Sequence, residues 1–367
     1  MVASCTFLAR RREGLGAPHL ENPMSIKALF TAIALTPLLI AVTTPPIAAQ
    51  STLPAPPVSD APIIDYQNRY LPTYGRVGMV VSPEVLAGEI GLDMLKQGGN
   101  AVDAAVATGF ALAVTLPRAG NIGGGGFMLI HLAETDEQIF IDYRETAPAA
   151  ATPGMFLNED GSVDQAKAYF SHQAAGVPGT VGGLIHAQER YGKLTLKQVI
   201  QPAIDLARNG IIVTERQAQS FAYYDSIFTV VNQKPLALFH QKKAGDTIVF
   251  EALANTLETI QNEGEQAFYG GSLTEKMVSF LQSNGGAHTL EDFKSYKAKW
   301  RDPITFDFLG NRIISMGPPS SGGVTLKQIF GMLGSLDLMN ESPDTAAYIH
   351  KLSATFRRSE EHTSELQ

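Results

Sequence analysis

Apolar side chains begin to recur at helical spacing near residue 81. Leu86, Ile90 and Met94 are four positions apart, so they share one face of a helix predicted over residues 81–97. Two glycines then end the pattern, and Asn100 is suited to cap a second helix because its side chain can accept backbone N–H bonds. This second helix is rich in alanine, and we expect it to be buried against a neighbour.

Short apolar runs on either side of polar turns predict two strand pairs. Residues 127–132 and 138–143 are joined by the polar residues 133–137, which indicates adjacent strands. Residues 304–308 and 312–316 flank a Leu-Gly-Asn sequence, which is a hairpin signal. Both pairs are short compared with the helical segments around them.

Helical spacing returns in six later segments. These are residues 180–191, 195–209, 253–262, 273–283, 290–298 and 324–336. Thr195 and Gln198 form a capping-box pattern at the start of the second of them. Strands inside and helices outside predict a layered domain of the α/β (α+β) class.

The first part of the chain has the pattern of a leader. Within residues 1–49, residues 1–23 are interpreted as preceding the true start, because their arginine cluster lies too far from the apolar run. A basic start at Met24, an apolar run over 28–42 and small residues ending at Ala49 predict a signal peptide that begins at Met24. A membrane anchor is the alternative, but a spanning helix needs about twenty apolar residues. Residues 50–77 begin with a proline-rich stretch and are interpreted as a lead-in to the body of the protein.

Charge and cysteine content narrow the class of protein. The formal net charge is −8, and an acidic body argues against nucleic acid as a partner, because the phosphate backbone selects basic surfaces. The single cysteine, Cys5, lies in the leader, so we expect no disulfide, no thiolate nucleophile and no cysteine metal site in the mature chain. An exported protein without disulfides fits a bacterial periplasm.

The histidines give no sign of a metal centre. Eight are scattered along the chain, and none is spaced as an HExxH motif or a paired ligand set. We therefore predict no metal and no other cofactor.

Four glycines at residues 123–126 invite comparison with a phosphate-binding loop. The run has neither the dinucleotide spacing nor the lysine of a Walker motif, and it leads into a strand instead of a helix. Close packing of the backbone beside a cleft is the interpretation we favour.

Arg144 is the residue with the most suggestive chemistry. It follows a predicted strand, where a loop begins, and its planar guanidinium can hold a carboxylate through two parallel hydrogen bonds. A structural alternative remains open from the residues alone, in which Arg144 pairs with Asp142 or Glu145.

Four motifs occur in one order along the chain, at residues 98–105, 118–130, 142–148 and 318–323. Their sequences are GGNAVDAA, RAGNIGGGGFMLI, DYRETAP and PPSSGG, and together they resemble gamma-glutamyltranspeptidase (glutathione hydrolase) proenzymes over about residues 78–357. The resemblance implies the large-subunit portion of such a precursor and the αββα four-layer sandwich of N-terminal-nucleophile hydrolases, incomplete in this chain. It also implies that Arg144 binds the α-carboxylate of the γ-glutamyl donor.

The catalytic group implied by the resemblance is a threonine exposed when the precursor cuts itself. That threonine is expected beyond the end of this chain, so no catalytic residue is assigned here, and the chain alone is expected to be inactive. Ser320 and Ser321 lack the Gly-x-Ser-x-Gly surroundings of a nucleophile and are given no catalytic role. The implied substrates are glutathione and related γ-glutamyl compounds, and the implied partner is the small subunit of the same precursor.

Two other functions remain as alternatives. A related acylase could remove acyl side chains from β-lactams, although an apolar acyl group gives an arginine nothing to pair with. A non-catalytic fragment or binding protein is the second alternative, but the loss of half a sandwich would leave strand edges and apolar faces uncovered.

The last ten residues, 358–367, are interpreted as not belonging to the natural protein. One choice of codons for RSEEHTSELQ reproduces a common sequencing-library adapter. We therefore expect this stretch to be an adapter-derived artefact and residues 78–357 to be the true body. A natural charged tail is the alternative.

Overall fold

The computed structural model describes residues 74–336, 338–343 and 345–364. The predicted signal peptide and nearly all of the lead-in, residues 1–73, lie outside the described residues. No helix within the described ranges is long and apolar enough to cross a membrane.

The first two helices form as the sequence predicts. Helix α1 is Val85–Lys96, and Gly98, with φ of 91°, follows it in the left-handed region that glycine adopts at low cost. Helix α2 is Ala101–Thr115, and the Asn100 side chain caps it by accepting the N–H of Asp103 at 3.1 Å. Helix α2 is buried along most of its length, as the small side chains indicated.

A three-stranded antiparallel sheet lies beside these helices, in the order β1-β2-β5. Strands β1 (Gly126–Leu132) and β2 (Glu137–Tyr143) pair directly, which confirms the first predicted strand pair. Strand β5 (Lys299–Arg301) was not predicted. The helix expected over 290–298 is wrong in its second half, because α10 ends at Lys294 (Leu290–Lys294) and the chain then extends to pair with β2.

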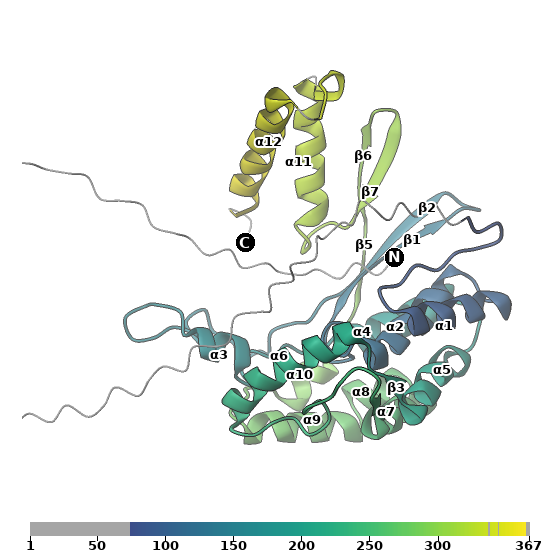
Figure 1. Cartoon of the computed structure of the whole chain (residues 1–367), viewed down its shortest axis with the longest axis vertical. Helices are drawn as coiled ribbons and strands as arrows, with labels where there is room; N and C mark the ends of the chain where they lie inside the picture. Colours follow the sequence, from purple (N-terminus) through teal and green to yellow (C-terminus); the bar gives the residue numbers. More distant parts are fainter. Residues whose placement is uncertain (1–73, 337, 344, 365–367) are drawn as a thin grey trace, which may run out of the picture.

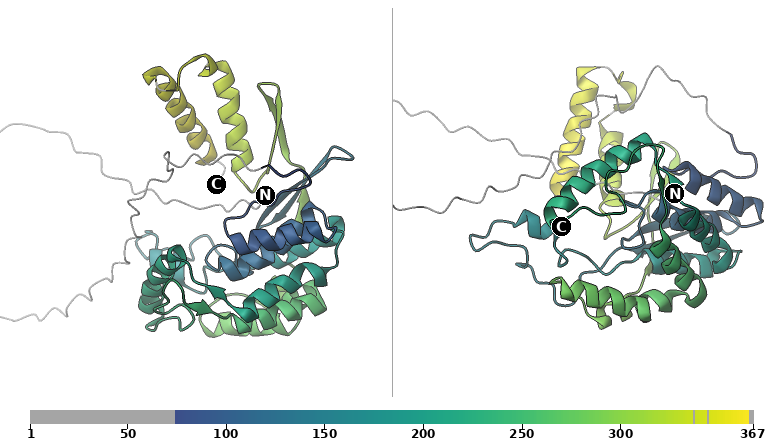
Figure 2. Two further views of the ribbon diagram at one scale, coloured as in Figure 1. Left: turned by 45° about the vertical axis from the view of Figure 1, so that its right-hand side comes forward. Right: turned by 60° about the horizontal axis from the view of Figure 1, so that its bottom comes forward.

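Most remaining helices lie on one side of the sheet (Figure 1). They are α4 (Thr180–Tyr191), α5 (Leu196–Asn209), α7 (Glu251–Glu263), α8 (Glu265–Tyr269) and α9 (Ser272–Ser283). Helix α4 contacts both β1 and β2, and α5 contacts α2 and α7. The core between them contains large, fully buried side chains, among them Phe110, Phe140, Phe268, Phe293, Ile185 and Leu257. Figure 2 shows the same arrangement from two other directions.

Five elements of this body besides β5 were not predicted. They are α3 (Gln165–Phe170), β3 (Ile211–Ile212), α6 (Glu215–Asn232), β4 (Thr247–Ile248) and α8 (Glu265–Tyr269). The longest is α6, whose apolar residues do not repeat on one face, although Thr214 and Gln217 form a capping box at its start.

The second predicted hairpin is also confirmed. Strands β6 (Ile304–Phe308) and β7 (Asn311–Ser315) pair antiparallel. Leu309 and Gly310 join them with φ of 50° and 76°, the two left-handed residues of a tight hairpin turn.

Two further helices lie beyond this hairpin, on the side of the sheet opposite the main body (Figure 1). Helix α11 (Gly322–Ser335) contacts β6, β7 and the long helix α12 (Ala346–Ser364), and a short 3-10 helix η1 (Leu338–Asn340) lies between the two. The strands therefore lie between two groups of helices. Helix α12 runs into the 358–367 stretch, whose adapter origin stays a prediction.

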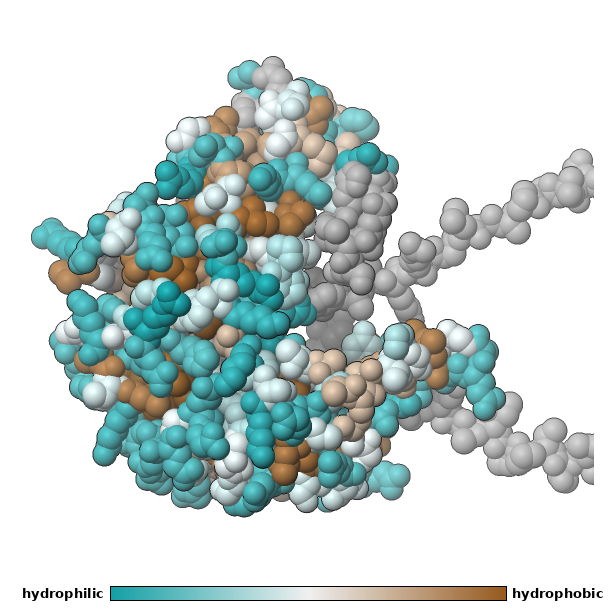
Figure 3. Space-filling model, turned by 180° about the vertical axis from the view of Figure 1, so that it is seen from behind, coloured by the Kyte–Doolittle hydropathy of each residue, from teal (hydrophilic) through white to brown (hydrophobic). Residues whose placement is uncertain are grey.

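The surface is mostly hydrophilic on the face seen in Figure 3, with hydrophobic residues in small separate groups. Apolar side chains that are well exposed include Val77, Val81 and Val85 near the start of the described chain.

A half-buried ion pair joins two helices of the main body. Nε2 of His186 on α4 lies 2.9 Å from Oε2 of Glu265 at the start of α8. The hydrogen bond that His186 donates to the Glu265 carboxylate raises the pKa of His186, against the effect of burial, and the same bond lowers the pKa of Glu265.

The stability of the body should therefore depend on pH through this pair. A raised His186 pKa stabilises the fold fully below the ordinary histidine value, about 6.5, and this contribution is lost as pH rises through the raised value. The Glu265 contribution is lost as pH falls through its lowered pKa. We expect Tm to fall by about 2–4 °C above the His186 pKa and His186→Gln to lack that slope. Thermal melts from pH 5 to pH 9 measure both.

His350→Gln is the matched control, because His350 is exposed. It should keep the wild-type dependence of Tm on pH. If His186→Gln also keeps that dependence, the pair does not cause it.

Candidate functional site

Arg144 lies immediately after the C-terminal end of β2, the central strand of the sheet, and its side chain is exposed. Nη1 of the guanidinium lies 3.5 Å from the carbonyl oxygen of Pro319, at the outer limit of a hydrogen bond. Its Cζ atom is 6.0 Å from the centre of the Phe127 ring. The guanidinium forms no ion pair with any residue in the described ranges.

The two acidic residues beside Arg144 are directed elsewhere. Asp142 is buried, its Oδ2 accepts a hydrogen bond from Nε of Arg301 at 2.8 Å, and its Oδ1 accepts the backbone N–H of Arg144 at 3.1 Å. The Glu145 carboxylate lies against the glycine run, close to Gly125. The alternative in which the Arg144 guanidinium pairs with Asp142 or Glu145 is therefore not found in the described structure.

The backbone of Arg144 is also held from its other side. The hydroxyl of Tyr296 donates to the Arg144 carbonyl oxygen at 3.0 Å, and Oδ1 of Asp292 accepts the N–H of Ala149 at 2.7 Å. Burial raises the pKa of Tyr296, which keeps its hydroxyl protonated as a donor. Its ring stacks on Tyr269, with ring centres 5.2 Å apart. The loop after β2 is thus fixed at both ends by the segment that follows α9.

The glycine run packs closely against neighbouring backbone, as predicted. A Cβ atom at Gly125 would lie 2.5 Å from the carbonyl oxygen of Tyr143, which is too close for any side chain. The carbonyl oxygen of Gly124 accepts the N–H groups of Gly179 and Thr180, at 2.8 and 3.0 Å. The first N–H groups of α4 are therefore used on protein backbone, and the run leads into β1.

The Pro-Pro-Ser-Ser-Gly-Gly loop approaches Arg144 from another part of the chain. It joins β7 to α11, contains a cis peptide bond between Pro318 and Pro319, and turns through a hydrogen bond from Gly322 N–H to Ser320 Oγ at 3.2 Å. The contact between Arg144 and Pro319 brings this loop to the end of β2. Three of the four motifs recognised in the sequence thus meet around one exposed cation.

The fourth motif, residues 98–105, has a structural role. The fully buried carboxylate of Asp103 accepts hydrogen bonds from Gln188 Nε2 at 2.6 Å and from the N–H groups of Asn100, Lys193 and Leu194, at 2.6, 3.0 and 2.9 Å. Burial alone would raise the pKa of Asp103, but these bonds together lower it. This role of Asp103 was not predicted from the sequence, although an acidic side chain three residues after a helix cap is a capping-box signal.

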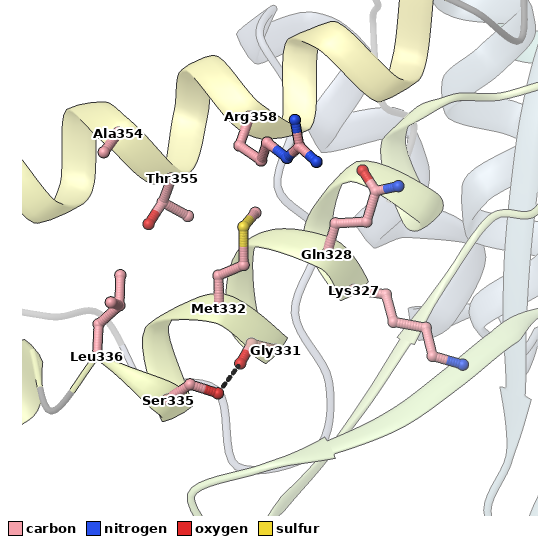
Figure 4. Close-up of a pocket in the computed structure, with 9 residues that line it drawn as sticks. All are labelled: Lys327, Gln328, Gly331, Met332, Ser335, Leu336, Ala354, Thr355 and Arg358. Atoms are coloured by element: carbon pink, nitrogen blue, oxygen red, sulfur yellow. Dashed lines mark hydrogen bonds between the residues drawn. The ribbon is translucent and has the colours of Figure 1, made fainter.

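A separate pocket lies between α11 and α12 (Figure 4). Lys327, Met332, Leu336 and Thr355 are among its lining residues, and Ser335 Oγ donates to the Gly331 carbonyl oxygen at 3.2 Å beside it. Arg144 does not line it. Within the described ranges no group of three or more histidine, cysteine, aspartate or glutamate side chains could hold a metal ion.

The chain is similar to proteins of one family. Residues 87–366 match the family model described as Gamma-glutamyltranspeptidase. The glutathione hydrolase proenzyme of Escherichia coli strain K12 is 45% identical over 294 residues, which are 79% of this chain and 50% of that protein. The chain spans about half the length of the curated bacterial relatives it matches.

Solved structures show the same similarity. The crystal structure of Helicobacter pylori gamma-glutamyltranspeptidase superposes with a TM-score of 0.75 at 41% identity, over 79% of this chain and 84% of that chain. The gamma-glutamyltranspeptidase from Pseudomonas nitroreducens, in complex with L-DON, gives a TM-score of 0.73 at 40% identity, over 78% and 85%. These similarities confirm the predicted fold class, which is α/β of the N-terminal-nucleophile hydrolase type.

Proposed function

The chain belongs to the gamma-glutamyltranspeptidase family, and on that premise we propose that it forms part of a γ-glutamyltransferase and glutathione hydrolase. The observation that supports this most is the Arg144 guanidinium, which is exposed and has no ion pair in the described ranges. It lies over Phe127, the residue directly after the glycine run, and within 3.5 Å of the Pro319 carbonyl oxygen in the 318–323 loop. A cation in this position suits a donor that carries a free carboxylate.

In the proposed reaction, Arg144 binds the α-carboxylate of a γ-glutamyl donor through two parallel N–H···O bonds. This contact fixes the glutamyl end and sets where the γ-amide carbonyl lies, which is an orientation effect. An acyl donor without a carboxylate would leave the guanidinium without a partner. The site therefore favours glutamyl donors over the apolar acyl groups of β-lactam side chains.

The covalent steps are assigned to residues outside this chain. A threonine exposed by self-cleavage would use its own α-amino group as the base that takes its hydroxyl proton. Its oxygen would attack the γ-amide carbonyl, form a γ-glutamyl ester and release the amine, which takes up the proton. Water or the amino group of a second molecule would then break the ester, giving glutamate or a new γ-glutamyl amide.

The proposal includes a partner subunit and a cellular location. The partner is the small subunit of the same precursor, in keeping with the proenzyme names of the relatives. Export to the bacterial periplasm is supported by the signal-peptide pattern that begins at Met24.

The proposal is tested with the protein produced from its complete gene. We expect a single precursor to become two polypeptides and then to release arylamine from a chromogenic γ-glutamyl anilide. A folded protein that is processed but releases no arylamine, and no amine from glutathione, would contradict the proposed activity.

A further inference from the structure

We propose that Arg301 is a positioning residue that keeps the guanidinium of Arg144 available. By holding the Asp142 carboxylate, Arg301 prevents this neighbouring anion from competing for Arg144. The proposal rests on the proposed function, in which the ligand of Arg144 is the carboxylate of a γ-glutamyl donor. The proposal gives strand β5 a functional role, although its residues lie outside the four sequence motifs.

The geometry of the two strands creates the competition. Asp142 precedes Arg144 by two positions at the end of β2, and one of its oxygens already accepts the Arg144 N–H at 3.1 Å. Residues two apart along an extended chain point to the same face. Phe127 is the cross-strand partner of Asp142 and also lies beneath the Arg144 guanidinium. The Asp142 carboxylate is therefore the nearest anion along the chain whose side chain shares that face.

Arg301 reaches Asp142 diagonally across the sheet. In the register between β2 and β5, Lys299 is the direct partner of Asp142, and Arg301 is two positions further on. Diagonal neighbours on one face are within reach of long side chains. Arg301 Nε lies 2.8 Å from Asp142 Oδ2, and the Asp142 side chain is only 7% exposed while that of Arg301 is 36% exposed.

The burial of Asp142 makes the loss of its ion pair with Arg301 costly. A buried carboxylate without a cation is unfavourable, so Asp142 would pair with another donor within reach. If Arg301 were absent, the cation already within two residues would be Arg144. The Glu145 carboxylate lies against Gly125 and is not placed to compete in the same way.

The rate at which phenylglyoxal modifies Arg144 tests the proposal without any assay of catalysis. This reagent adds to guanidinium groups, and a guanidinium held by a carboxylate reacts more slowly than a free one. The rate at each arginine is followed by peptide mass spectrometry on the folded protein from the complete gene. Arg301→Met should slow modification of Arg144 about fivefold, the effect of a pair worth about 1 kcal/mol.

The second variant removes the competitor as well. In Asp142→Asn/Arg301→Met no carboxylate remains to capture Arg144, while the asparagine oxygen can still accept the Arg144 N–H. Modification of Arg144 should return to within about twofold of wild type. If Arg301 had only a structural role, the double variant would be at least as disturbed as Arg301→Met. The rate of Arg144 modification would then not return toward the wild-type rate.

Lys299→Met is the matched control. Lys299 faces Asp142 in the strand register but forms no ion pair with it in the described ranges, so its loss should leave Arg144 reactive. Melting curves check that each variant is folded. Arg301→Gln replaces Arg301→Met if the methionine variant is not recovered as folded protein.

Kinetics separate this proposal from the proposed function. The KM for a γ-glutamyl donor should rise about fivefold in Arg301→Met and return in the double variant, with kcat little changed. If the modification rates follow the prediction but KM does not, the donor carboxylate is not the ligand of Arg144. The proposed function itself fails only if the wild-type protein does not turn over the γ-glutamyl donor at all. If Arg144 reacts at the wild-type rate in Arg301→Met, or stays slow in the double variant, the role of Arg301 is wrong.

Discussion

Replacing Arg144 with glutamine is expected to raise KM for a γ-glutamyl donor by about 10- to 100-fold while kcat changes much less. A hydrogen bond between charged groups contributes roughly 1.5 to 3 kcal/mol, and each 1.4 kcal/mol corresponds to a factor of about ten. The contact is made to the bound donor before reaction as well as during it, so its loss weakens binding first. Initial rates over a range of γ-glutamyl anilide concentrations measure both constants.

Two further variants make this result specific. Arg144→Lys keeps the charge but loses the planar fork, so KM should fall between the wild-type and glutamine values. Arg312→Gln is the matched control, because Arg312 is an exposed arginine paired with Asp136 at 3.1 Å, away from the site. An unchanged KM in Arg144→Gln would show that Arg144 does not bind the donor.

The second large effect is expected on stability. Asp103→Ala should lower the free energy of unfolding by about 3–5 kcal/mol, because it removes the acceptor of several hydrogen bonds at a fully buried position. The Lys193 and Leu194 N–H groups would lose their acceptor, and the Gln188 amide would keep only its bond to the Leu194 carbonyl oxygen at 2.7 Å. The corresponding fall in Tm is roughly 10 °C. Urea unfolding followed by circular dichroism measures the change in the free energy of unfolding, and thermal melts measure the change in Tm.

Asp93→Ala provides the comparison for that prediction. Asp93 is an exposed aspartate on α1 that pairs with Lys96 at 2.8 Å, and surface pairs of this kind contribute at most about 1 kcal/mol. If the two alanine variants were equally stable, the Asp103 hydrogen bonds would not anchor α2.

Local patterns predicted much of the fold. Asn100 as a helix cap, the Thr195 and Gln198 capping box, and the turn at Leu309 and Gly310 all depend on residues close in sequence, and the structure confirms each of them. Their signals are strong because the interacting groups are only a few positions apart. For such elements a single sequence carries most of the information.

Other elements depend on distant partners and left little local signal. Strand β5 has three residues and exists because it pairs with β2, far earlier in the chain. Helix α6 begins at a capping box, but its apolar side chains do not follow one helical face. Short strands and mixed helices of this kind are decided by tertiary contacts.

The candidate site shows the same division. The position of Arg144 after a strand was predictable from the sequence, and so was its suitability for a carboxylate. That Arg144 forms no ion pair among the described residues was not predictable, because the neighbouring Asp142 is held by Arg301, 159 positions later. The Tyr296 hydroxyl that fixes the Arg144 carbonyl is 152 positions away and was equally invisible to local reasoning.

The most direct test of the central claim changes the protein and the donor together. Wild type and Arg144→Gln, both from the complete gene, are assayed with a γ-glutamyl anilide and with the 4-aminobutyryl anilide, which lacks only the α-carboxylate. If Arg144 binds that group, removing it should raise the wild-type KM about 10- to 100-fold and have little effect on the variant. An equal loss in both proteins would contradict the assignment of Arg144 to the donor carboxylate.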